Sequence, residues 1–277
     1  MTRKNLVFVA DTHIMHNLAV CPPTLVLSNG SMVSQHPLRD KIWQHWCHFW
    51  DYQLPKWIGD EKFILVVNGD LIEGYTNRIL SFISTNPADF TLAAAALLRP
   101  IIERSNCAGL ILITGTDVHV GIEGFYEHQV FQILAASNRD KLLGIFNRKT
   151  LRVNGVSISV AHHISGSYRS SSRGTPLAVE LAETNVNYAL AGESPPDIII
   201  RGHSHIYREY TYNNQTVITL PAWCLVTHHA INRIPTARTD PMLATLGGIL
   251  LQIDDDGEIL LQKYLHKIKD DDLVMEL

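Results

Sequence analysis

The sequence predicts an α/β (α+β) fold, a four-layer α-β-β-α sandwich in which two mixed sheets pack face to face with helices outside. Strand-like and helix-like segments alternate through the first half of the 277 residues, and strand-like segments dominate the second half. A hydrophobic content of 46% is enough for a large core. No internal repeat, low-complexity tract or linker interrupts the pattern, so we expect residues 1–277 to form one domain.

The first predicted elements are a strand, an irregular segment, a helix and a second strand. The apolar runs at residues 5–10 and 63–67 are typical of buried strands, and residues 17–34 contain turn signals. Residues 38–54 carry three tryptophans and other apolar residues at helical spacing. Such a stripe could stack on bases, but packing of a helix against a sheet is the simpler interpretation.

Capping and turn residues delimit the middle of the chain. An Asn-Pro pair at residues 86–87 is typical of a helix start. Residues 110–114 predict a third strand, and residues 122–136 predict a helix. The Asn-Gly pair at residues 154–155 predicts a hairpin with a strand on each side, the second of which ends at residue 161.

The rest of the chain is a polar segment, a helix and further strands. Residues 165–174 are small and polar, residues 176–191 predict a helix, and residues 197–201 predict a strand. Alternating apolar residues with turns between them then predict antiparallel strands. These strands are expected at residues 207–212, 216–220, 248–253 and 259–264.

Composition excludes several classes of protein. The net charge of −4 argues against a module that holds nucleic acid by electrostatics alone, although bound metal ions would add positive charge. The four cysteines form no C-x-x-C pair, and no apolar stretch is long enough to span a bilayer. No signal-peptide core precedes the first strand. We therefore expect a cytoplasmic protein with no membrane association, and the sequence leaves its oligomeric state open.

Five short segments rich in histidine and aspartate each follow an apolar, strand-like run. They are Asp11-Thr12-His13, Gly69-Asp70-Leu71-Ile72-Glu73, Gly115-Thr116-Asp117-Val118-His119, His162-His163 and Gly202-His203-Ser204-His205. Any one of them has a simple structural explanation, such as a turn or a helix cap. Together, carboxylates and imidazoles at one edge of a sheet predict a metal site, and two groups of ligands suit phosphoester hydrolysis.

The order of these motifs, D-x-H, G-D-x-x-E, a G-N-H-type element, H and G-H-x-H, resembles the calcineurin-like metallophosphoesterase superfamily. The motifs span Asp11 to His205. The spacing is similar in particular to phage- and prophage-encoded members, in which the third motif is Gly-Thr-acidic-x-His and a Pro-Ala-Trp follows the last motif. Here the latter is Pro221-Ala222-Trp223. A phage-encoded protein would act in the cytoplasm of a bacterial host.

The resemblance implies two metal ions bridged by Asp70, which would thereby act in catalysis. The remaining implied ligands are Asp11, His13 and His205 for one ion, and His203 with His162 or His163 for the other. Successive residues at a strand end point in opposite directions, so the choice between the two adjacent histidines stays open. Mixed carboxylate and imidazole ligation favours Mn²⁺, with Fe, Zn, Ni or Co able to substitute.

The third motif departs from the family pattern, because the usual Asn is absent and the histidine lies further from the glycine. Asp117 could replace the Asn as a ligand, whereas the neutral hydroxyl of Thr116 is a weaker candidate. His119 could act as a general acid or donate to a phosphate oxygen. A damaged second metal site is the alternative interpretation.

Other residues are candidates for supporting roles. Glu73 could accept a hydrogen bond from a ligand imidazole or a bound water, or be an exposed loop carboxylate. In the polar loop after His163, Arg169 and Arg173 could hold a phosphate while Tyr168 stacks on a base. A solvated connection is the alternative for that loop.

The sequence thus predicts a metal-dependent phosphoesterase, with a phosphodiesterase or nuclease acting on a short or single-stranded nucleic acid or a nucleotide as the favoured form. A phosphomonoesterase, or a catalytically impaired protein that serves as a binding partner or scaffold, is the alternative. The H-E-x-x-H motif of metalloproteases and the H-x-E with P-C-x-x-C of deaminases are absent.

Overall fold

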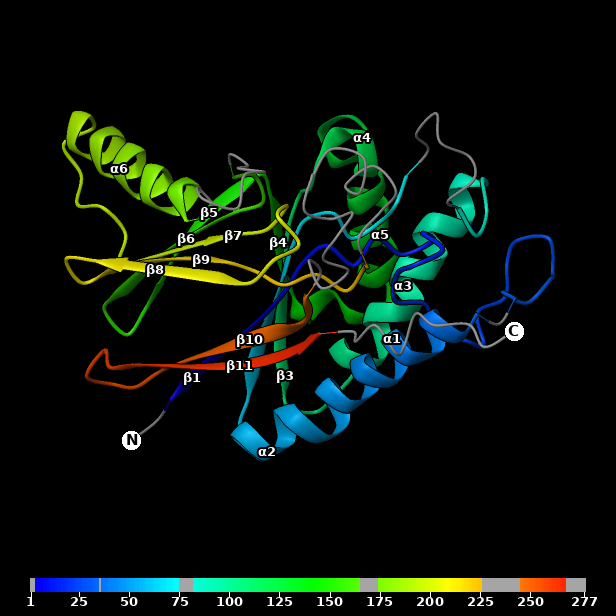
Figure 1. Cartoon of the computed structure of the whole chain (residues 1–277). Coiled ribbons are helices and arrows are strands. Elements are labelled where there is room, and N and C mark those ends of the chain that lie inside the picture. Colours follow the sequence, from blue (N-terminus) through cyan, green and yellow to red (C-terminus); the bar gives the residue numbers. More distant parts are fainter. Residues whose placement is uncertain (1–2, 35, 75–81, 165–173, 226–244, 268–277) are drawn as a thin grey trace.

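The computed structural model describes residues 3–34, 36–74, 82–164, 174–225 and 245–267, and two sheets lie at its centre (Figure 1). The strands of the first sheet are β1 (Lys4–Val9), β2 (Phe63–Asn68), β3 (Cys107–Ile113), β4 (Leu142–Phe146), β10 (Thr245–Ile253) and β11 (Ile259–Lys267). Their order is β11-β10-β1-β2-β3-β4, with β1 to β4 parallel and β10 antiparallel to both β1 and β11.

The second sheet is also mixed. Its strands are β5 (Arg148–Val153), β6 (Val156–Ala161), β7 (Ile198–Arg201), β8 (Arg208–Tyr212) and β9 (Gln215–Thr219), in the order β5-β6-β7-β9-β8. Two tight turns form its antiparallel pairs. Asn154 and Gly155 both have positive φ, as the predicted hairpin requires, and Asn213 and Asn214 do the same between β8 and β9.

The facing sides of the two sheets form one apolar layer. Along β1 and just beyond it, Leu6, Phe8 and Ala10 point toward the second sheet, whereas Val7 and Val9 point toward the helices. Residues of the second sheet that meet this layer include Ile158, Val160, Ile198, Ile200 and Ile218. Because both faces of the central strands are buried, these strands carry continuous apolar runs rather than alternating ones.

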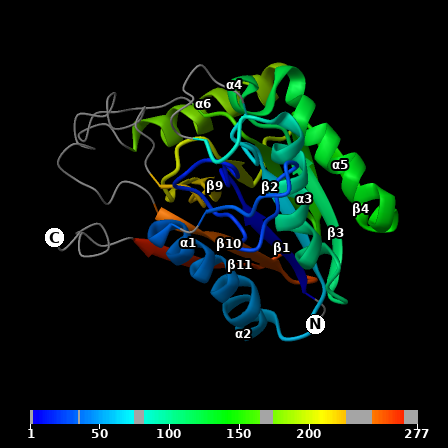
Figure 2. The ribbon, with the colours of Figure 1, turned by 90° about the vertical axis from the view of Figure 1, so that its right-hand side faces the viewer.

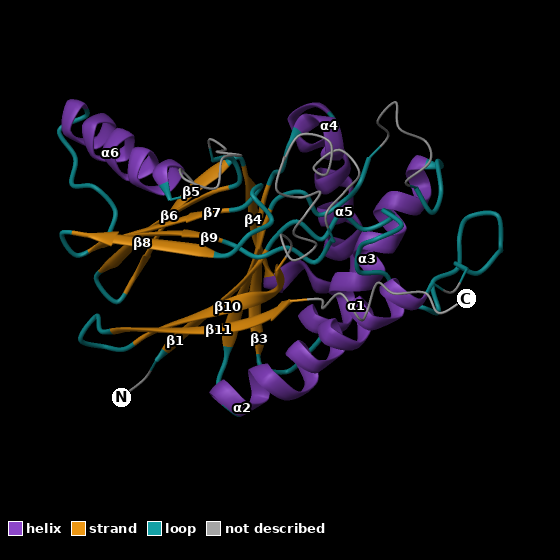
Figure 3. Ribbon diagram, viewed as in Figure 1, coloured by secondary structure: helices purple, strands orange, loops and turns teal. Residues whose placement is uncertain are grey.

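Helices cover the outer faces of both sheets (Figures 2 and 3). The longer ones are α1 (Pro37–His48), α3 (Pro87–Ile102), α5 (Phe125–Asn138) and α6 (Thr175–Leu190), and the short ones are α2 (Leu54–Ile58) and α4 (Asp117–Val120). Helices α1, α2, α3 and α5 pack on the first sheet, and α6 packs on the second. The predicted four-layer α-β-β-α sandwich of two mixed sheets is therefore confirmed.

The predicted helix over residues 38–54 is divided in the structure. A π-helical segment, Phe49–Gln53, joins α1 to α2. Trp46 and Trp50 are buried, and the ring centroid of Trp46 lies 4.8 Å from that of Trp223. The interpretation of the tryptophan stripe as packing is confirmed, since these rings fill the layer between helix and sheet.

Three details differ from the sequence predictions. Strand β4 was not predicted, although its residues are apolar apart from a central glycine. The helix predicted over residues 122–136 begins only at Phe125, after a 3-10 turn at Ile122–Gly124, and the single-turn helix α4 precedes it. A second 3-10 turn, Arg139–Lys141, leads into β4.

In the described part of the chain, every helix is too short or too polar to cross a membrane.

Candidate metal centre

The predicted ligands converge where the strands of both sheets end. Asp11 follows β1, Asp70 follows β2, and Thr116 follows β3 after a short turn in the first sheet. His162 directly follows β6, and His203 follows β7 in the second sheet. Because β1, β2 and β3 run parallel, as do β6 and β7, their carboxyl ends lie at one edge of the sandwich.

One group of ligand atoms comes from Asp11, His13 and His205, which lie close enough to hold a single ion. The Nε2 atoms of His13 and His205 are 3.1 Å apart, and His205 Nε2 lies 3.3 Å from Asp11 Oδ1. Asp70 Oδ2 is 3.9 Å from His13 Nε2. The Asp70 carboxylate therefore lies beside this group as a second carboxylate.

A second group is formed by Asp70, His162 and His203. His162 Nε2 lies 3.0 Å from Asp70 Oδ2 and 3.9 Å from Asp11 Oδ1. Asp70 also groups with His13 and His119. It is thus the residue shared between the two ends of the cluster, the position that a bridging ligand needs.

Two hydrogen bonds fix which imidazole nitrogens face inward. His162 Nδ1 lies 2.8 Å from the carbonyl oxygen of Asn68, and His13 Nδ1 lies 2.6 Å from Glu73 Oε2. Each Nδ1 therefore donates, which leaves the Nε2 lone pair directed into the cluster. His162 Nε2 is buried and has no hydrogen-bond donor among the described residues. An inward lone pair beside buried carboxylates fits a divalent cation.

The backbone at the ligands is strained. Asp11, His13, Asp70, His203 and His205 all have positive φ, at 49°, 41°, 47°, 65° and 56°. Asp and His tolerate this left-handed region better than most residues, but it still costs about 1–3 kcal/mol per residue. Concentration of such strain in five candidate ligands is typical of a functional site.

Burial and charge pairing shift the pKa values of the cluster in opposite directions. Burial acts to raise the pKa of Asp11 and Asp70, but the neighbouring imidazoles hold both well below their usual range. Burial acts to lower the pKa of His162, but the charges of Asp70 and Asp11 raise it to about 9. The two buried anions thus stabilise the protonated forms of His162 and His13 when no cation competes for the same atoms.

This pairing predicts a pH trend in the metal-free protein. The folded pKa of His162, about 9, exceeds the 6.5 of an unperturbed histidine, so its contribution to stability is complete below pH 6.5 and is lost as pH rises toward 9. The Tm of the chelator-treated protein should therefore fall by several degrees over this range. Mn²⁺ affinity should rise over the same range, because binding displaces the proton. Calorimetry at several pH values measures both, and a flat Tm profile would contradict the assignment.

Comparisons with solved structures find similar chain arrangements at low identity. Vps29 from Cryptosporidium parvum is 10% identical, with 97% of this chain and 100% of that chain covered, at a TM-score of 0.44. Zinc-complexed Vps29 from Entamoeba histolytica is 9% identical (94% and 98% covered, TM-score 0.41). An archaeal phosphodiesterase is 11% identical (95% and 99% covered, TM-score 0.43). Since each of these TM-scores is below 0.5, the likenesses carry no argument about activity. No protein-family model and no curated protein matches the chain.

The fold that the motif order predicted is present in the structure itself. Two mixed sheets lie face to face, helices cover both outer faces, and the motifs meet at one edge. The chain has the predicted four-layer α-β-β-α architecture, with the five motifs at one edge of the sandwich. The phage-like spacing of the third motif stays a resemblance in sequence.

The third motif places Asp117 and Thr116 differently with respect to the cluster. Asp117 is not among the grouped ligands; it is exposed at the start of α4, and its Oδ1 accepts from the Glu123 N–H at 3.1 Å. Thr116 is the residue that lies in the cluster. Its N–H donates to Asp70 Oδ1 at 2.6 Å, and its Oγ1 lies 3.2 Å from Asp70 Oδ2 and 3.3 Å from His203 Nδ1. The residue next to the glycine faces the site, and the helical turn directs Asp117 away.

The remaining predicted residues occupy the rim and the support of the site. His162 is buried and belongs to the second group, whereas His163 is exposed. Glu73 is buried, and its Oε2 lies 2.6 Å from His13 Nδ1 and 3.2 Å from His119 Nδ1. His119 itself is partly exposed. Tyr168, Arg169 and Arg173 lie outside the described residues.

One residue beside the cluster received too little weight in the sequence analysis, and another was not considered. Thr116 was set aside because a hydroxyl is a weak ligand, although its direct succession to Gly115 was a signal. Glu127 was not considered. It is buried in α5 with its two carboxylate oxygens bonded to backbone N–H groups, and burial raises its pKa to about 8. Its place on the core-facing stripe of the helix, three residues before Val130, was the available signal.

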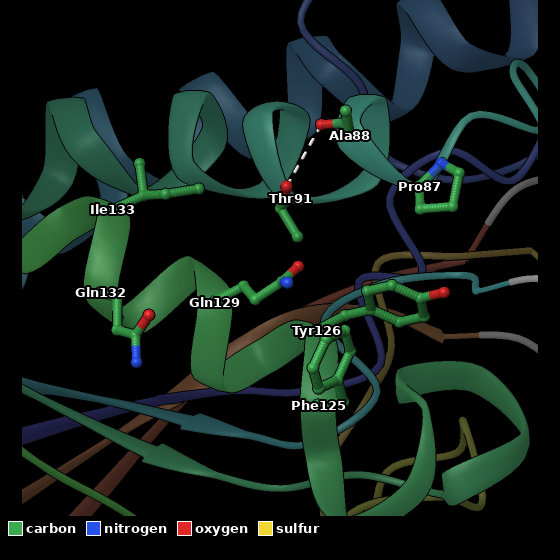
Figure 4. A pocket seen from close by; sticks show the side chains of 8 residues that line it. All are labelled: Pro87, Ala88, Thr91, Phe125, Tyr126, Gln129, Gln132 and Ile133. Carbon is green, nitrogen blue, oxygen red and sulfur yellow. Dashed lines mark hydrogen bonds between the residues drawn. The ribbon is translucent and has the colours of Figure 1, made fainter.

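A groove of about 610 Å³ lies between α3 and α5, apart from the ligand cluster (Figure 4). Its lining is uncharged, with Tyr126 and Phe125 together at one end and Gln132 and Ile133 at the other. The Tyr126 ring lies within 3.5 Å of the position of a Cβ on Gly74 and on Gly121. None of its lining residues is a candidate metal ligand, so the cluster remains the candidate reaction centre.

Proposed function

We propose that this chain hydrolyses phosphoesters through two divalent metal ions held in the cluster. The observation that carries the proposal is the position of Asp70, whose buried carboxylate groups with His13 and His119 on one side and with His162 and His203 on the other. Two-metal hydrolases require a bridging ligand of this kind to hold two cations at a short separation. The inward Nε2 lone pair of His162 and the buried carboxylates supply the donor set that hard and borderline cations prefer.

The residues of the chain have distinct roles in such a reaction. The ions, when bound, supply a water nucleophile of lowered pKa and positive charge toward the phosphoryl oxygens. His119, at the partly exposed rim, holds a proton at Nε2 for the departing oxygen while its Nδ1 faces Glu73. Burial opposes ionisation of Glu73, but the neighbouring imidazoles of His119 and His13 hold its pKa well below its usual range. Glu73 accepts a hydrogen bond from His13 Nδ1 and thereby orients that imidazole, and it lies 3.2 Å from His119 Nδ1.

Mn²⁺ is the proposed metal, with Fe, Zn, Ni or Co able to substitute, because the ligands mix carboxylate oxygen with imidazole nitrogen. The test combines metal counting with turnover. Protein purified in Mn²⁺ should contain about two ions per chain and should hydrolyse an aryl phosphodiester and, at a different rate, an aryl phosphomonoester. Chelation should remove both activities. Full activity after chelation would overturn the proposal.

The favoured substrate is a phosphodiester in a short or single-stranded nucleic acid or a nucleotide. Support comes from the mildly acidic net charge of −4, which disfavours long duplexes, and from the phage-like third motif. A cytoplasmic location fits such a substrate and the four free cysteines.

The loop that contains Tyr168, Arg169 and Arg173 is proposed to contact this substrate. Replacing both arginines by alanine should raise KM for an oligonucleotide by at least about tenfold, the loss of one or two charge-assisted contacts. KM for a small aryl phosphodiester should hardly change. Steady-state kinetics on both substrates measure this, with Arg152→Ala, on strand β5, as a control. An equal effect on both substrates would show that the loop does not bind nucleic acid.

A second candidate is a binding or scaffold protein that has lost catalysis. The specific observation in its favour is that Thr116 stands beside Asp70 and His203, where the family pattern has a stronger ligand. Metal content separates the candidates. A protein with one ion or none and no turnover on either ester would favour the scaffold.

A further inference from the structure

Glu127 is a buried carboxylate in an otherwise conventional core position. The buried residues of α5 are Glu127, Val130, Leu134 and Asn138, a spacing of three and four that defines the helix face toward the sheet. Glu127 is 1% exposed. Burial of a carboxylate is costly unless its oxygens receive hydrogen bonds, so an apolar residue would be the cheaper choice at this position.

The two oxygens of Glu127 bond to two different metal motifs. Oε1 accepts from the N–H of Leu71 at 3.1 Å, and Oε2 accepts from the N–H of Gly115 at 2.8 Å. Leu71 directly follows Asp70, and Gly115 directly precedes Thr116. In the described part of the chain, Glu127 forms no ion pair with lysine or arginine. Among the described residues, both of its hydrogen bonds join the second motif to the third.

The spacing of these two motifs sets the direction of the Asp70 carboxylate. Asp70 has a φ of 47°, and its Oδ1 accepts from the N–H of Thr116 at 2.6 Å. Gly115 packs so closely that a Cβ there would lie 2.2 Å from Asp70 Oδ1. If the two loops separated, the hydrogen bond from Thr116 would be lost and the strained Asp70 would be free to relax.

We propose that Glu127 is a positioning residue that holds the second and third motifs together and thereby keeps the Asp70 carboxylate aligned for metal binding. It acts through Asp70 and is not itself a ligand. The inference rests on the proposed metal site but does not depend on which ester the site hydrolyses.

Mn²⁺ titration by calorimetry of the full chain, starting from chelated protein, tests this inference. Glu127→Gln keeps the volume of the side chain but places an NH₂ donor against one backbone N–H, so one of the two bonds is lost. Mn²⁺ affinity should fall about 10–100-fold, the effect of removing a group that orients a ligand. Glu127→Asp should also bind Mn²⁺ more weakly than the wild-type protein, because its side chain is shorter and extends less far toward both N–H groups.

Asp89→Asn is the matched control. Asp89 is also a buried carboxylate, 4% exposed, that accepts at 2.6 Å from the Ser28 N–H and at 2.6 Å from the Ser84 hydroxyl, and it lies in the first turn of α3. Asp89→Asn should lower the Tm and leave Mn²⁺ affinity unchanged. The Tm of each chelated variant identifies a purely structural effect.

Each result has a distinct meaning. Wild-type affinity in Glu127→Gln, or an equal loss in Asp89→Asn, would overturn the positioning role while leaving the metal site intact. Failure of the wild-type protein itself to bind Mn²⁺ would overturn the proposed function, and with it this inference. If Glu127→Gln does not fold, the same titration of Glu127→Asp decides, because wild-type affinity there would equally overturn the role.

Discussion

Replacement of Asp70 by asparagine is expected to abolish metal-dependent hydrolysis, with kcat/KM falling by at least about 10³-fold, the loss of a major electrostatic contribution to the transition state. Oδ1 of Asp70 accepts from the Thr116 N–H, and Oδ2 faces His162 Nε2. In one orientation of the asparagine amide, its NH₂ group would face the N–H donor of Thr116. In the other orientation, the NH₂ group would occupy the position of the shared ligand oxygen. The measurement is steady-state hydrolysis of an aryl phosphodiester at saturating Mn²⁺, together with metal counting.

Asp60→Asn serves as the comparison for this change, because Asp60 is exposed in the turn after α2. It should retain wild-type activity and metal content. Circular dichroism should show that Asp70→Asn is folded, since the exchange preserves side-chain volume. Wild-type turnover in Asp70→Asn would remove the shared carboxylate from the mechanism, and with it the two-metal proposal.

Substitution of Gly115 by alanine is expected to damage the site strongly, although it adds only one methyl group. A Cβ on Gly115 would lie 2.1 Å from the backbone nitrogen of Asp70 and 2.2 Å from its Oδ1. Overpacking of this kind costs about 1–3 kcal/mol or more, and here the obstructing atoms are a backbone atom and a metal ligand. We expect a Tm lower by at least several degrees and loss of Mn²⁺ binding.

Gly174→Ala provides the contrast for the glycine experiment. A Cβ on Gly174 would have nothing within 4 Å, and the residue has a φ of −84°. Differential scanning calorimetry should find its Tm close to that of the wild-type protein, with Mn²⁺ affinity unchanged. A Gly115→Ala protein that matches it in both respects would show that the third motif does not pack on Asp70 as described.

The positions of the candidate ligands could be predicted because the sequence indicates where the strands end. Apolar runs before Asp11, Asp70 and His162 mark buried parallel strands, and parallel strands bring their carboxyl ends to one edge. No distance in space was needed for this prediction. Strand β4 was missed although its residues are apolar apart from Gly144.

The role of each side chain near a turn was harder to predict. Sequence spacing placed Asp117 and Thr116 both near Gly115, and charge favoured Asp117. The structure places the start of α4 at Asp117, so the helical turn directs its carboxylate to the Glu123 N–H and leaves Thr116 facing Asp70. Glu127 was missed for a related reason, since its partners are backbone N–H groups that carry no side-chain signal.

The positive φ of five candidate ligands limits how this site can be redesigned. Asp11, His13, Asp70, His203 and His205 occupy a backbone region that glycine, asparagine, aspartate and histidine enter most easily. Cysteine or glutamate, the usual choices for changing metal preference, would raise the backbone cost at each position above the one that aspartate or histidine already has there. The backbone therefore favours three types of ligand at these positions. Exchanges between aspartate, asparagine and histidine are the first substitutions to test for a change in metal preference.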